Sequence, residues 1–364
     1  MTEAALREKA EAGIAATAGA AHALLVGRGC TALWLWLRVM DFAGRGVVVP
    51  ANICPVVPYT IVLSGNHPVF VDTDASGLAD LAALARLPAS CAAAALGVHT
   101  YGHVLDWTRF AAVCQEKGWE MFEDAAAALG ARHGDAPVGG LAGAGVLSFG
   151  PGKQLDLPGG GALTCRDARL RREAARLFAR FEPLSLDAIM ARARGFTERF
   201  WHGNGLESGA FSLDDLAWTL LCGIEAPADY LDALNRGIGS LAQDTAQRQA
   251  KAEALRRGLD HPDVRHQPAP QGSAYWRYNI LAGRDRDRLL AHLRREGIKA
   301  SAYFGPCHRL FAATRELDFP ASEREGSRIV NLWVGPQTSL AETGRIAREI
   351  VRFFDEIPAG EATE

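Results

Sequence analysis

The sequence has no Cys-x-x-Cys pair and no long apolar run, although it is 364 residues long and contains seven cysteines. An odd number of cysteines without such pairs argues against a disulfide framework or a zinc site and indicates a reducing compartment. The most apolar stretch, residues 33–40, is interrupted by Arg38 and is shorter than the roughly 18 residues of a membrane span. The first residues are polar and lack the regions of a secretory signal. We therefore expect a cytoplasmic protein that binds no metal.

The sequence also lacks a strong excess of charge. The net charge is −3 at pH 7, which excludes a global attraction to nucleic acid or to anionic membranes. Arginines are frequent in residues 166–180, which leaves a basic nucleic-acid face open. The interspersed Glu173 and Glu182 favour a solvated helix face instead. Because hydrophobic residues make up 48% of the chain, a large core and two or three domains are expected.

Short apolar runs alternate with helical patterns over the first 165 residues or so. Each run is bounded by polar or turn residues, as is typical of buried parallel strands. The expected strands are residues 46–49, 67–72, 92–98, 119–122, 146–149 and 161–165. The alternation predicts an α/β fold, with a mainly parallel sheet and helices on both of its faces.

The pattern changes in the second half of the chain. Residues 166–235 are expected to be mainly helical, and a polar helix at 241–258 is expected to lead into a second domain. Beyond it we expect strands at 275–281 and 329–334 and helices at 285–296 and 339–356. The sequence therefore predicts a large domain at residues 1–240 and a smaller α+β domain at residues 241–364.

Lys153 lies in a glycine- and proline-rich loop that follows one of the expected strands. Open α/β sheets bind their ligands at the carboxyl ends of the strands, so the lysine is a candidate functional residue. Asp124 follows another strand and precedes a run of alanines. It could cap a following helix, or it could hold a protonated pyridine nitrogen, which needs a buried anion.

Gly29, Cys30 and Thr31 precede an apolar helical stretch at residues 32–40. Glycine and a hydroxyl at the start of a helix offer free N–H groups to a phosphate, because the positive end of the helix dipole lies there. An ordinary N-cap would explain the same residues.

The order of these three features resembles that of fold-type I pyridoxal phosphate enzymes, and specifically of the DegT/DnrJ/EryC1/StrS sugar aminotransferase family. The resemblance covers most of the chain. Residues 29–33 are similar to the family's G-T-x-A-L segment, and residues 98–102 to V-H-L-Y-G. Further matches lie at residues 48–51 with 68–72, at 123–126 with 130–131, and at 148–149 with Lys153, Gly160 and Gly161.

The resemblance implies a large domain with a mostly parallel seven-stranded sheet, and a pyridoxal phosphate cofactor held covalently by Lys153. It implies that Asp124 pairs with the cofactor's pyridine nitrogen, and that Ser148 contacts its phosphate together with Gly29, Cys30 and Thr31. The freed Lys153 amine would then be the base. The donor would usually be glutamate and the acceptor a keto group on a nucleotide-linked sugar. A homodimer is also implied.

The sequence departs from the family at several positions of the expected cofactor site. Ala127 replaces a glutamine, Cys54 replaces an aromatic residue, and Gly152 replaces a threonine or serine. The family's N-Y-R segment has no clear match near residues 210–216. These differences leave open a dehydration or elimination on the same scaffold, and a non-catalytic regulatory protein that binds the cofactor. The lysine favours transamination, because the sugar dehydratases that resemble this family carry histidine there.

Several aromatic and histidine side chains are candidates to contact the substrate. His99, Tyr101 and His103 follow an expected strand, where a metal site is the less favoured alternative. Four residues are predicted to contact the substrate, namely His99, Tyr101, Tyr303 and His308. Trp276 and Tyr278 could border it as well, although core packing explains these aromatic residues equally well.

Overall fold

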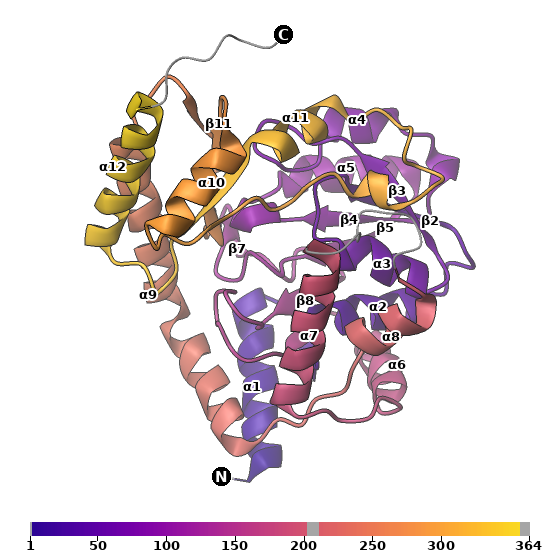
Figure 1. The fold of residues 1–364 in the computed structure, drawn as a ribbon. Coiled ribbons are helices and arrows are strands. Elements are labelled where there is room, and N and C mark those ends of the chain that lie inside the picture. Colours follow the sequence, from indigo (N-terminus) through magenta and orange to yellow (C-terminus); the bar gives the residue numbers. More distant parts are fainter. Residues whose placement is uncertain (1, 202–210, 357–364) are drawn as a thin grey trace.

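The computed structural model describes residues 2–201 and 211–356. Its largest feature is a seven-stranded sheet built from the first half of the chain (Figure 1). In spatial order its strands are β1 (His22–Val26), β9 (Gly161–Cys165), β8 (Ala144–Ser148), β5 (Glu120–Asp124), β4 (Ala94–Val98), β2 (Gly46–Pro50) and β3 (His67–Val71). Strands β2, β3, β4, β5 and β8 pair in parallel, whereas β9 runs antiparallel to its neighbours β1 and β8.

The prediction of a mostly parallel seven-stranded sheet is confirmed. The strand β1 is absent from the sequence-based expectation. Its sequence, H-A-L-L-V, suits a helix as well as a strand, and its partner β9 lies far along the chain. Local pattern alone therefore does not identify it.

Both faces of the sheet are buried. Successive side chains of a strand point to opposite faces, and in β2 Val47 and Val49 pack into one hydrophobic cluster while Val48 packs into another. Such strands are stable only if helices cover both faces, as the alternating sequence pattern predicted.

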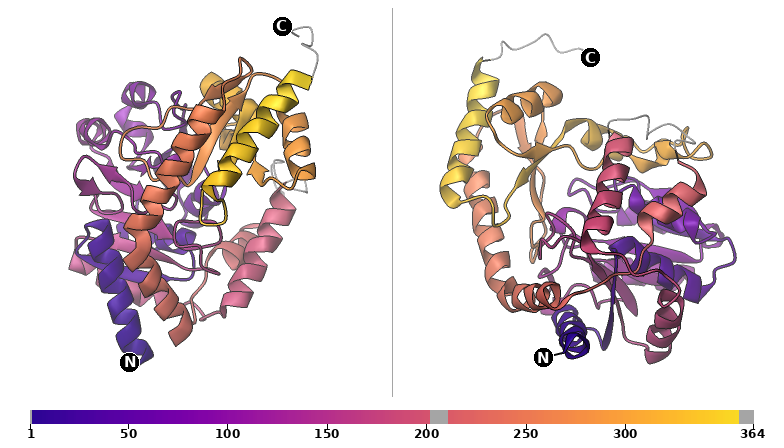
Figure 2. Two further views of the ribbon diagram at one scale, coloured as in Figure 1. Left: turned by 90° about the vertical axis from the view of Figure 1, so that its left-hand side faces the viewer. Right: turned by 60° about the horizontal axis from the view of Figure 1, so that its bottom comes forward.

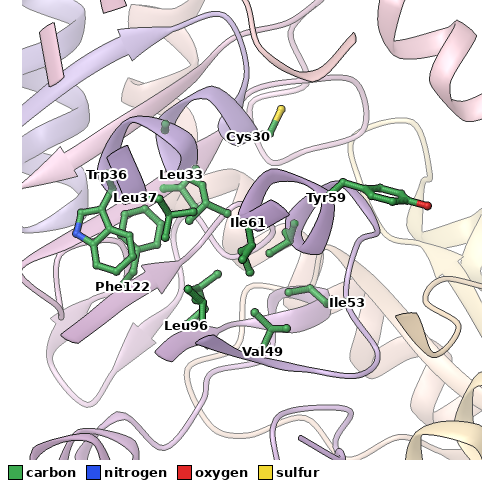
Figure 3. Packing of buried hydrophobic residues seen from close by; sticks show 14 of the residues in the cluster. Cys30, Leu33, Trp36, Leu37, Val49, Ile53, Tyr59, Ile61, Leu96 and Phe122 are labelled. Carbon is green, nitrogen blue, oxygen red and sulfur yellow. The ribbon is translucent and has the colours of Figure 1, made fainter. Parts of the chain in front are cut away.

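One face is covered by helices that pack around α2. Figure 3 shows Leu33 and Leu37 of α2 close to Leu96 of the sheet, and Trp36 and Phe122 lie with ring centroids 4.6 Å apart. The helices on this face are α2 (Gly29–Met40), α3 (Val56–Leu63), α6 (Ala168–Phe178), α7 (Leu186–Trp201) and α8 (Leu213–Leu220).

The opposite face is covered by α1 (Glu3–Ala18), α4 (Leu81–Arg86), α5 (Trp107–Lys117) and the first part of α9 (Ala228–Gly258). The helix α9 is 31 residues long and begins after Pro227, whereas the sequence pattern placed its start at residue 241. It runs from beside α1 to beside α12 and so joins the two halves of the molecule (Figures 1 and 2).

The second half contains an antiparallel sheet with the order β10–β11–β13–β12. Its strands are β10 (Val264–His266), β11 (Arg277–Ala282), β12 (Ala300–Ser301) and β13 (Ile329–Trp333). The helices here are α10 (Arg286–Arg295), α11 (Pro320–Arg328) and α12 (Leu340–Glu356). The expected strands and helices of this half are present, each within about two residues of its predicted ends, and β10, β12 and α11 are additions. The predicted domain boundary at residues 240–241 falls inside α9 and stays a prediction.

Shorter elements connect these parts. The small hairpin of β6 (Arg132–His133) and β7 (Ala136–Pro137) follows the turn after β5. Three short 3-10 helices occupy connections, namely η1 (Ala89–Cys91), η2 (Thr100–Gly102) and η3 (Cys307–Leu310). In the described part of the chain, no helix is both long and apolar enough to cross a membrane. The carboxyl ends of β2, β4, β5 and β8 meet at one edge of the large sheet, and the candidate site lies there.

Candidate active site

Lys153 lies in the loop that follows β8, and hydrogen bonds within the loop fix its backbone. The Lys153 N–H donates to the Gly150 carbonyl at 3.1 Å, and the Gly152 N–H donates to Oδ1 of Asp156 at 2.6 Å. The Nζ atom lies 4.7 Å from the ring centroid of Trp276. Burial lowers the pKa of the Lys153 amine, although Cys54 and Asp124 oppose this shift. The lysine is therefore not a freely solvated surface residue.

Asp124 ends β5 and is 7% exposed. Its Oδ1 accepts the N–H of Ala126 at 3.0 Å. Burial raises the pKa of this carboxyl, while the Ala126 amide and the nearby Lys153 oppose the rise. Because turns rather than a helix follow at residues 126–130, the interpretation of Asp124 as a helix cap is wrong. The carboxyl is close enough to Lys153 for each group to influence the pKa of the other.

The start of α2 lies against the end of β8. A Cβ placed on Gly29 would lie 3.5 Å from the Cβ of Ser148, and the N-cap residue Arg28 gives no side-chain cap. The N-terminus of α2 thus lies beside Ser148. An anion is favoured at such a helix start, because the N–H groups and the positive end of the dipole coincide there.

The side chains of Cys30 and Thr31 are engaged elsewhere, contrary to the expectation that they face a phosphate. The thiol of Cys30 donates to the Leu220 carbonyl at 2.8 Å. The Thr31 hydroxyl accepts the N–H of Cys222 at 3.2 Å. Both residues thus attach the segment after α8 to α2, so only their backbone remains available to a ligand.

An aromatic group forms one wall beside Lys153. Trp276 stacks with Phe304 at 5.9 Å and with Tyr303 at 6.4 Å between ring centroids, and Tyr101 stacks with Phe304 at 5.8 Å. Cys54 and Ala127 pack against this group. The structure therefore brings Cys54, Ala127, Tyr101 and Tyr303 together with Lys153, although they lie far apart in the sequence.

Gln154 brings an amide to the position where Ala127 offers none. Its Nε2 donates to the Ala127 carbonyl at 2.5 Å. Its buried Oε1 has no hydrogen-bond partner in the part of the chain that the structure describes. A buried acceptor without a partner next to Lys153 is typical of a site that a polar ligand completes.

His99 and His308 have partners inside the protein. His99 Nε2 lies 3.0 Å from Oε1 of Glu123, and its Nδ1 accepts the Leu105 N–H at 3.1 Å. His308 Nε2 lies 3.2 Å from Oε1 of Glu323. His308 Nδ1 is buried and has no hydrogen-bond partner among the described residues, and the prediction that these two histidines contact the substrate stays a prediction.

The remaining candidates are also accounted for. His103 Nδ1 bonds the Ser76 carbonyl at 2.9 Å, and burial lowers the pKa of this imidazole to about 4. The Tyr278 hydroxyl lies 2.6 Å from Nδ1 of His266. Within residues 2–201 and 211–356, no three His, Cys, Asp or Glu side chains lie close enough together to hold a metal ion.

Sequence reasoning missed Arg277, which lies at the start of β11 and close to Lys153. Its guanidinium Nη1 donates to the Gly152 carbonyl at 3.3 Å, and the Trp276 indole donates to the same oxygen at 2.8 Å. A signal was present in the sequence, since an arginine inside an apolar strand pattern must be buried or must face a partner.

Comparisons with known proteins show which family the chain resembles. The model of the DegT/DnrJ/EryC1/StrS aminotransferase family matches residues 2–351. The "Erythromycin biosynthesis sensory transduction protein EryC1" of Saccharopolyspora erythraea is 29% identical over 340 residues, which cover 91% of this chain and 86% of that protein. The "UDP-4-amino-4-deoxy-L-arabinose--oxoglutarate aminotransferase" of Shewanella sediminis is 26% identical, with 80% and 73% covered. A crystal structure of a DegT DnrJ EryC1 StrS aminotransferase from Brucella abortus superposes with a TM-score of 0.74 at 25% identity, covering 97% of this chain and 91% of that one.

Proposed function

Because the chain belongs to the DegT/DnrJ/EryC1/StrS aminotransferase family, we propose that it carries pyridoxal phosphate on Lys153 and transfers an amino group from an amino acid to a keto group on a sugar or nucleotide-linked sugar. One observation carries the proposal. At one sheet edge, the half-buried Lys153 lies near the carboxylate of Asp124, and the uncapped start of α2 lies beside Ser148.

The residues present fit the cofactor. Asp124 would hold the pyridine nitrogen, since it is a buried carboxylate. Among the described residues it forms no ion pair, although Lys153 lies near enough to influence its pKa. Ser148 and the N-terminus of α2 would hold the phosphate. The unpartnered Oε1 of Gln154 and the Cys54 side chain would border the ring. When bound, the cofactor supplies an electron sink for the substrate's α-carbon.

Lys153 would move the proton. Burial lowers the pKa of its amine, so more of the amine is neutral near pH 7 than for a solvated lysine, and a neutral amine accepts a proton. Trp276 restricts where Nζ can go, because the amine lies over its ring. The aromatic wall of Tyr101, Trp276 and Phe304 excludes water from the same space.

The relatives support the choice of substrates. The Shewanella sediminis relative is named as an aminotransferase that works between an amino sugar nucleotide and oxoglutarate, the keto form of glutamate. We therefore propose glutamate as the donor and a keto sugar as the acceptor. The lysine at position 153 favours transamination over dehydration.

We also propose that the protein acts as a homodimer in the cytoplasm. Helix α8 exposes Trp218 and Leu213, which are 61% and 58% exposed, while α3 and α7 pack against the same helix. Large apolar side chains on one short helix are typical of a surface that another subunit covers.

The experiment that tests the proposal uses the purified protein loaded with pyridoxal phosphate. Borohydride should fix the cofactor on Lys153, and peptide mapping would identify the modified lysine. L-Glutamate alone should convert the bound aldehyde to the amine form, with a shift of the absorption spectrum. If no amino donor causes this change while the cofactor is fully bound, transamination is wrong. An adduct on another lysine would disprove the site assignment.

A further inference from the structure

Arg277 is a buried cation without a carboxylate partner. It is 3% exposed, and its Nη1 donates only to the carbonyls of Trp276 at 2.8 Å and Gly152 at 3.3 Å. Its Nε has no hydrogen-bond partner, and no acidic side chain in residues 2–201 and 211–356 forms an ion pair with it. Burial of a charge is costly unless an anion lies beside it. Arg277 therefore needs an anionic partner, and a ligand with a negative charge can supply it.

The guanidinium lies close to two aromatic rings. Its Cζ lies 4.2 Å from the ring centroid of Trp276 and 3.8 Å from that of Trp333. A stacked guanidinium can bond only through the N–H groups around its edge, and it presents them as a rigid fork. That geometry suits a planar anion with two oxygens, since a carboxylate can accept two parallel hydrogen bonds.

Other cations around the same loop increase the need for an anion. Arg248 is also buried, and its Nη2 approaches the Lys153 carbonyl at 3.5 Å. Burial and the nearby Arg248 lower the pKa of Arg277 to about 9. The nearest acid, Asp156, uses its oxygens on the Gly152 N–H and on Nε2 of Gln337. Three basic side chains thus meet at this loop, where Asp156 cannot pair with all of them.

We propose that Arg277 binds the α-carboxylate of the amino donor, which is the carboxylate on the same carbon as the reacting amine. Lys153 Nζ lies 4.7 Å and Arg277 Cζ lies 4.2 Å from the ring centroid of Trp276, so the reacting amine and the guanidinium border the same side chain. A keto sugar has no such carboxylate, so Arg277 selects the donor and not the acceptor. This inference rests on the proposed function.

A pocket lies next to the aromatic residues that surround Arg277. Tyr303 and Trp333 line a pocket of about 580 Å³, and both belong to the aromatic surroundings of Trp276 and Arg277. Gly152 has no side chain, and a Cβ there would lie 2.9 Å from Nη2 of Arg277. The absence of that Cβ leaves room for the guanidinium beside the Lys153 loop.

The test compares two donors that differ only in this carboxylate. L-Glutamate has it, whereas 4-aminobutanoate lacks it and keeps the distal one. In the cofactor-loaded protein, Arg277→Gln should raise the L-glutamate concentration for half-maximal conversion by about 10- to 100-fold. The slower conversion by 4-aminobutanoate should stay within about twofold of the wild type, since that donor never used the guanidinium fork.

Matched variants and a binding measurement complete the design. Arg265→Gln, an exposed arginine on β10, should leave both donors unchanged. Arg277→Lys keeps a cation but loses the forked donor geometry, so its half-saturating L-glutamate concentration should lie between those of the wild type and Arg277→Gln. If Arg277→Gln does not fold, Arg277→Lys provides the test. Calorimetric titration with 2-oxoglutarate should show binding to the wild type and at least tenfold weaker binding to the variant, whether or not any turnover occurs.

Two outcomes would overturn the inference. One is an unchanged half-saturation for L-glutamate in Arg277→Gln and Arg277→Lys. The other is an equal loss with both donors, which would make Arg277 a structural support of the loop. If instead no donor converts the wild-type cofactor, the proposed function fails, and the titration with 2-oxoglutarate still decides whether Arg277 binds a carboxylate.

Discussion

The Nη2 atom of Arg277 lies 2.9 Å from the point where a Cβ on Gly152 would stand. The two residues are 125 positions apart, yet the Gly152 carbonyl accepts a hydrogen bond from Arg277. The absence of a side chain at position 152, which departs from the family, is therefore explained by the arginine that occupies the space. Gly152 also has a φ of +76°, a conformation that other residues rarely adopt.

The first prediction concerns Gly152→Ala. The added methyl group should displace the guanidinium and strain the backbone, at a cost of about 1–3 kcal/mol in the free energy of unfolding. L-Glutamate should then saturate the protein at several-fold higher concentration. Urea unfolding and the spectral titration would measure the two effects. Gly239→Ala, on α9 with no atom near the added Cβ, is the control. Wild-type donor binding in Gly152→Ala would contradict the steric explanation.

Several site residues could be predicted from local sequence because they follow the strands of one parallel sheet. Asp124 and Ser148 end strands, and Lys153 follows five residues after Ser148. Parallel strands bring their carboxyl ends to one edge, so residues placed there must meet. This rule needs no knowledge of how the second sheet packs.

The other features of the site depend on contacts between segments that are distant in the sequence. Trp276 and Arg277 reach the Lys153 loop from the second sheet, and no periodicity states which loop a strand will face. The side chains of Cys30 and Thr31 face the segment after α8 for the same reason. The hydroxyl and thiol at the start of α2 fitted a phosphate site equally well, until the packing of residues 220–222 became known.

The second prediction concerns Asp124→Asn. The substitution keeps the size of the side chain and the hydrogen bond to Ala126, but it removes the charge near Lys153. Loss of one partner of a buried charged pair costs about 3–5 kcal/mol, so conversion by L-glutamate should slow by at least about 100-fold. Stopped-flow absorbance would measure it. Asp106→Asn, at the exposed cap of α5, should react normally. A wild-type rate in Asp124→Asn would exclude the carboxylate as the partner of the pyridine nitrogen.

The third prediction concerns the proposed dimer. Leu213 and Leu340 are both 58% exposed, but only Leu213 lies on α8, the helix that also exposes Trp218. If α8 lies in the subunit interface, Leu213→Glu should place a charge in it and shift the protein toward monomers, while Leu340→Glu should not. Sedimentation velocity at low micromolar concentration would distinguish the two. A Leu213→Glu protein that remains dimeric would remove α8 from the interface.

The fourth prediction concerns pH and Glu325, which lies on α11 beneath the second sheet. Its Oε2 accepts Nε2 of Gln267 at 3.1 Å, and Arg265 Nη2 lies 3.9 Å from its Oε1. Burial raises the pKa of this carboxyl to about 7, although Gln267 and Arg265 oppose the rise. Between its unfolded value of 4.5 and about pH 7, the folded protein therefore holds a proton that the unfolded chain has released.

It follows that Glu325 makes the protein less stable as the pH rises through this window. Glu325→Gln keeps an uncharged acceptor at the same place, so it should have little effect at pH 4.5 and should stabilise the protein above pH 7 by up to about 3 kcal/mol. Urea unfolding at pH 5 and pH 8 would measure the difference. Glu120→Gln, an exposed position on β5, is the control. An equal effect of Glu325→Gln at both pH values would mean that the carboxyl is already ionised in the folded protein, and that Gln267 and Arg265 together outweigh its burial.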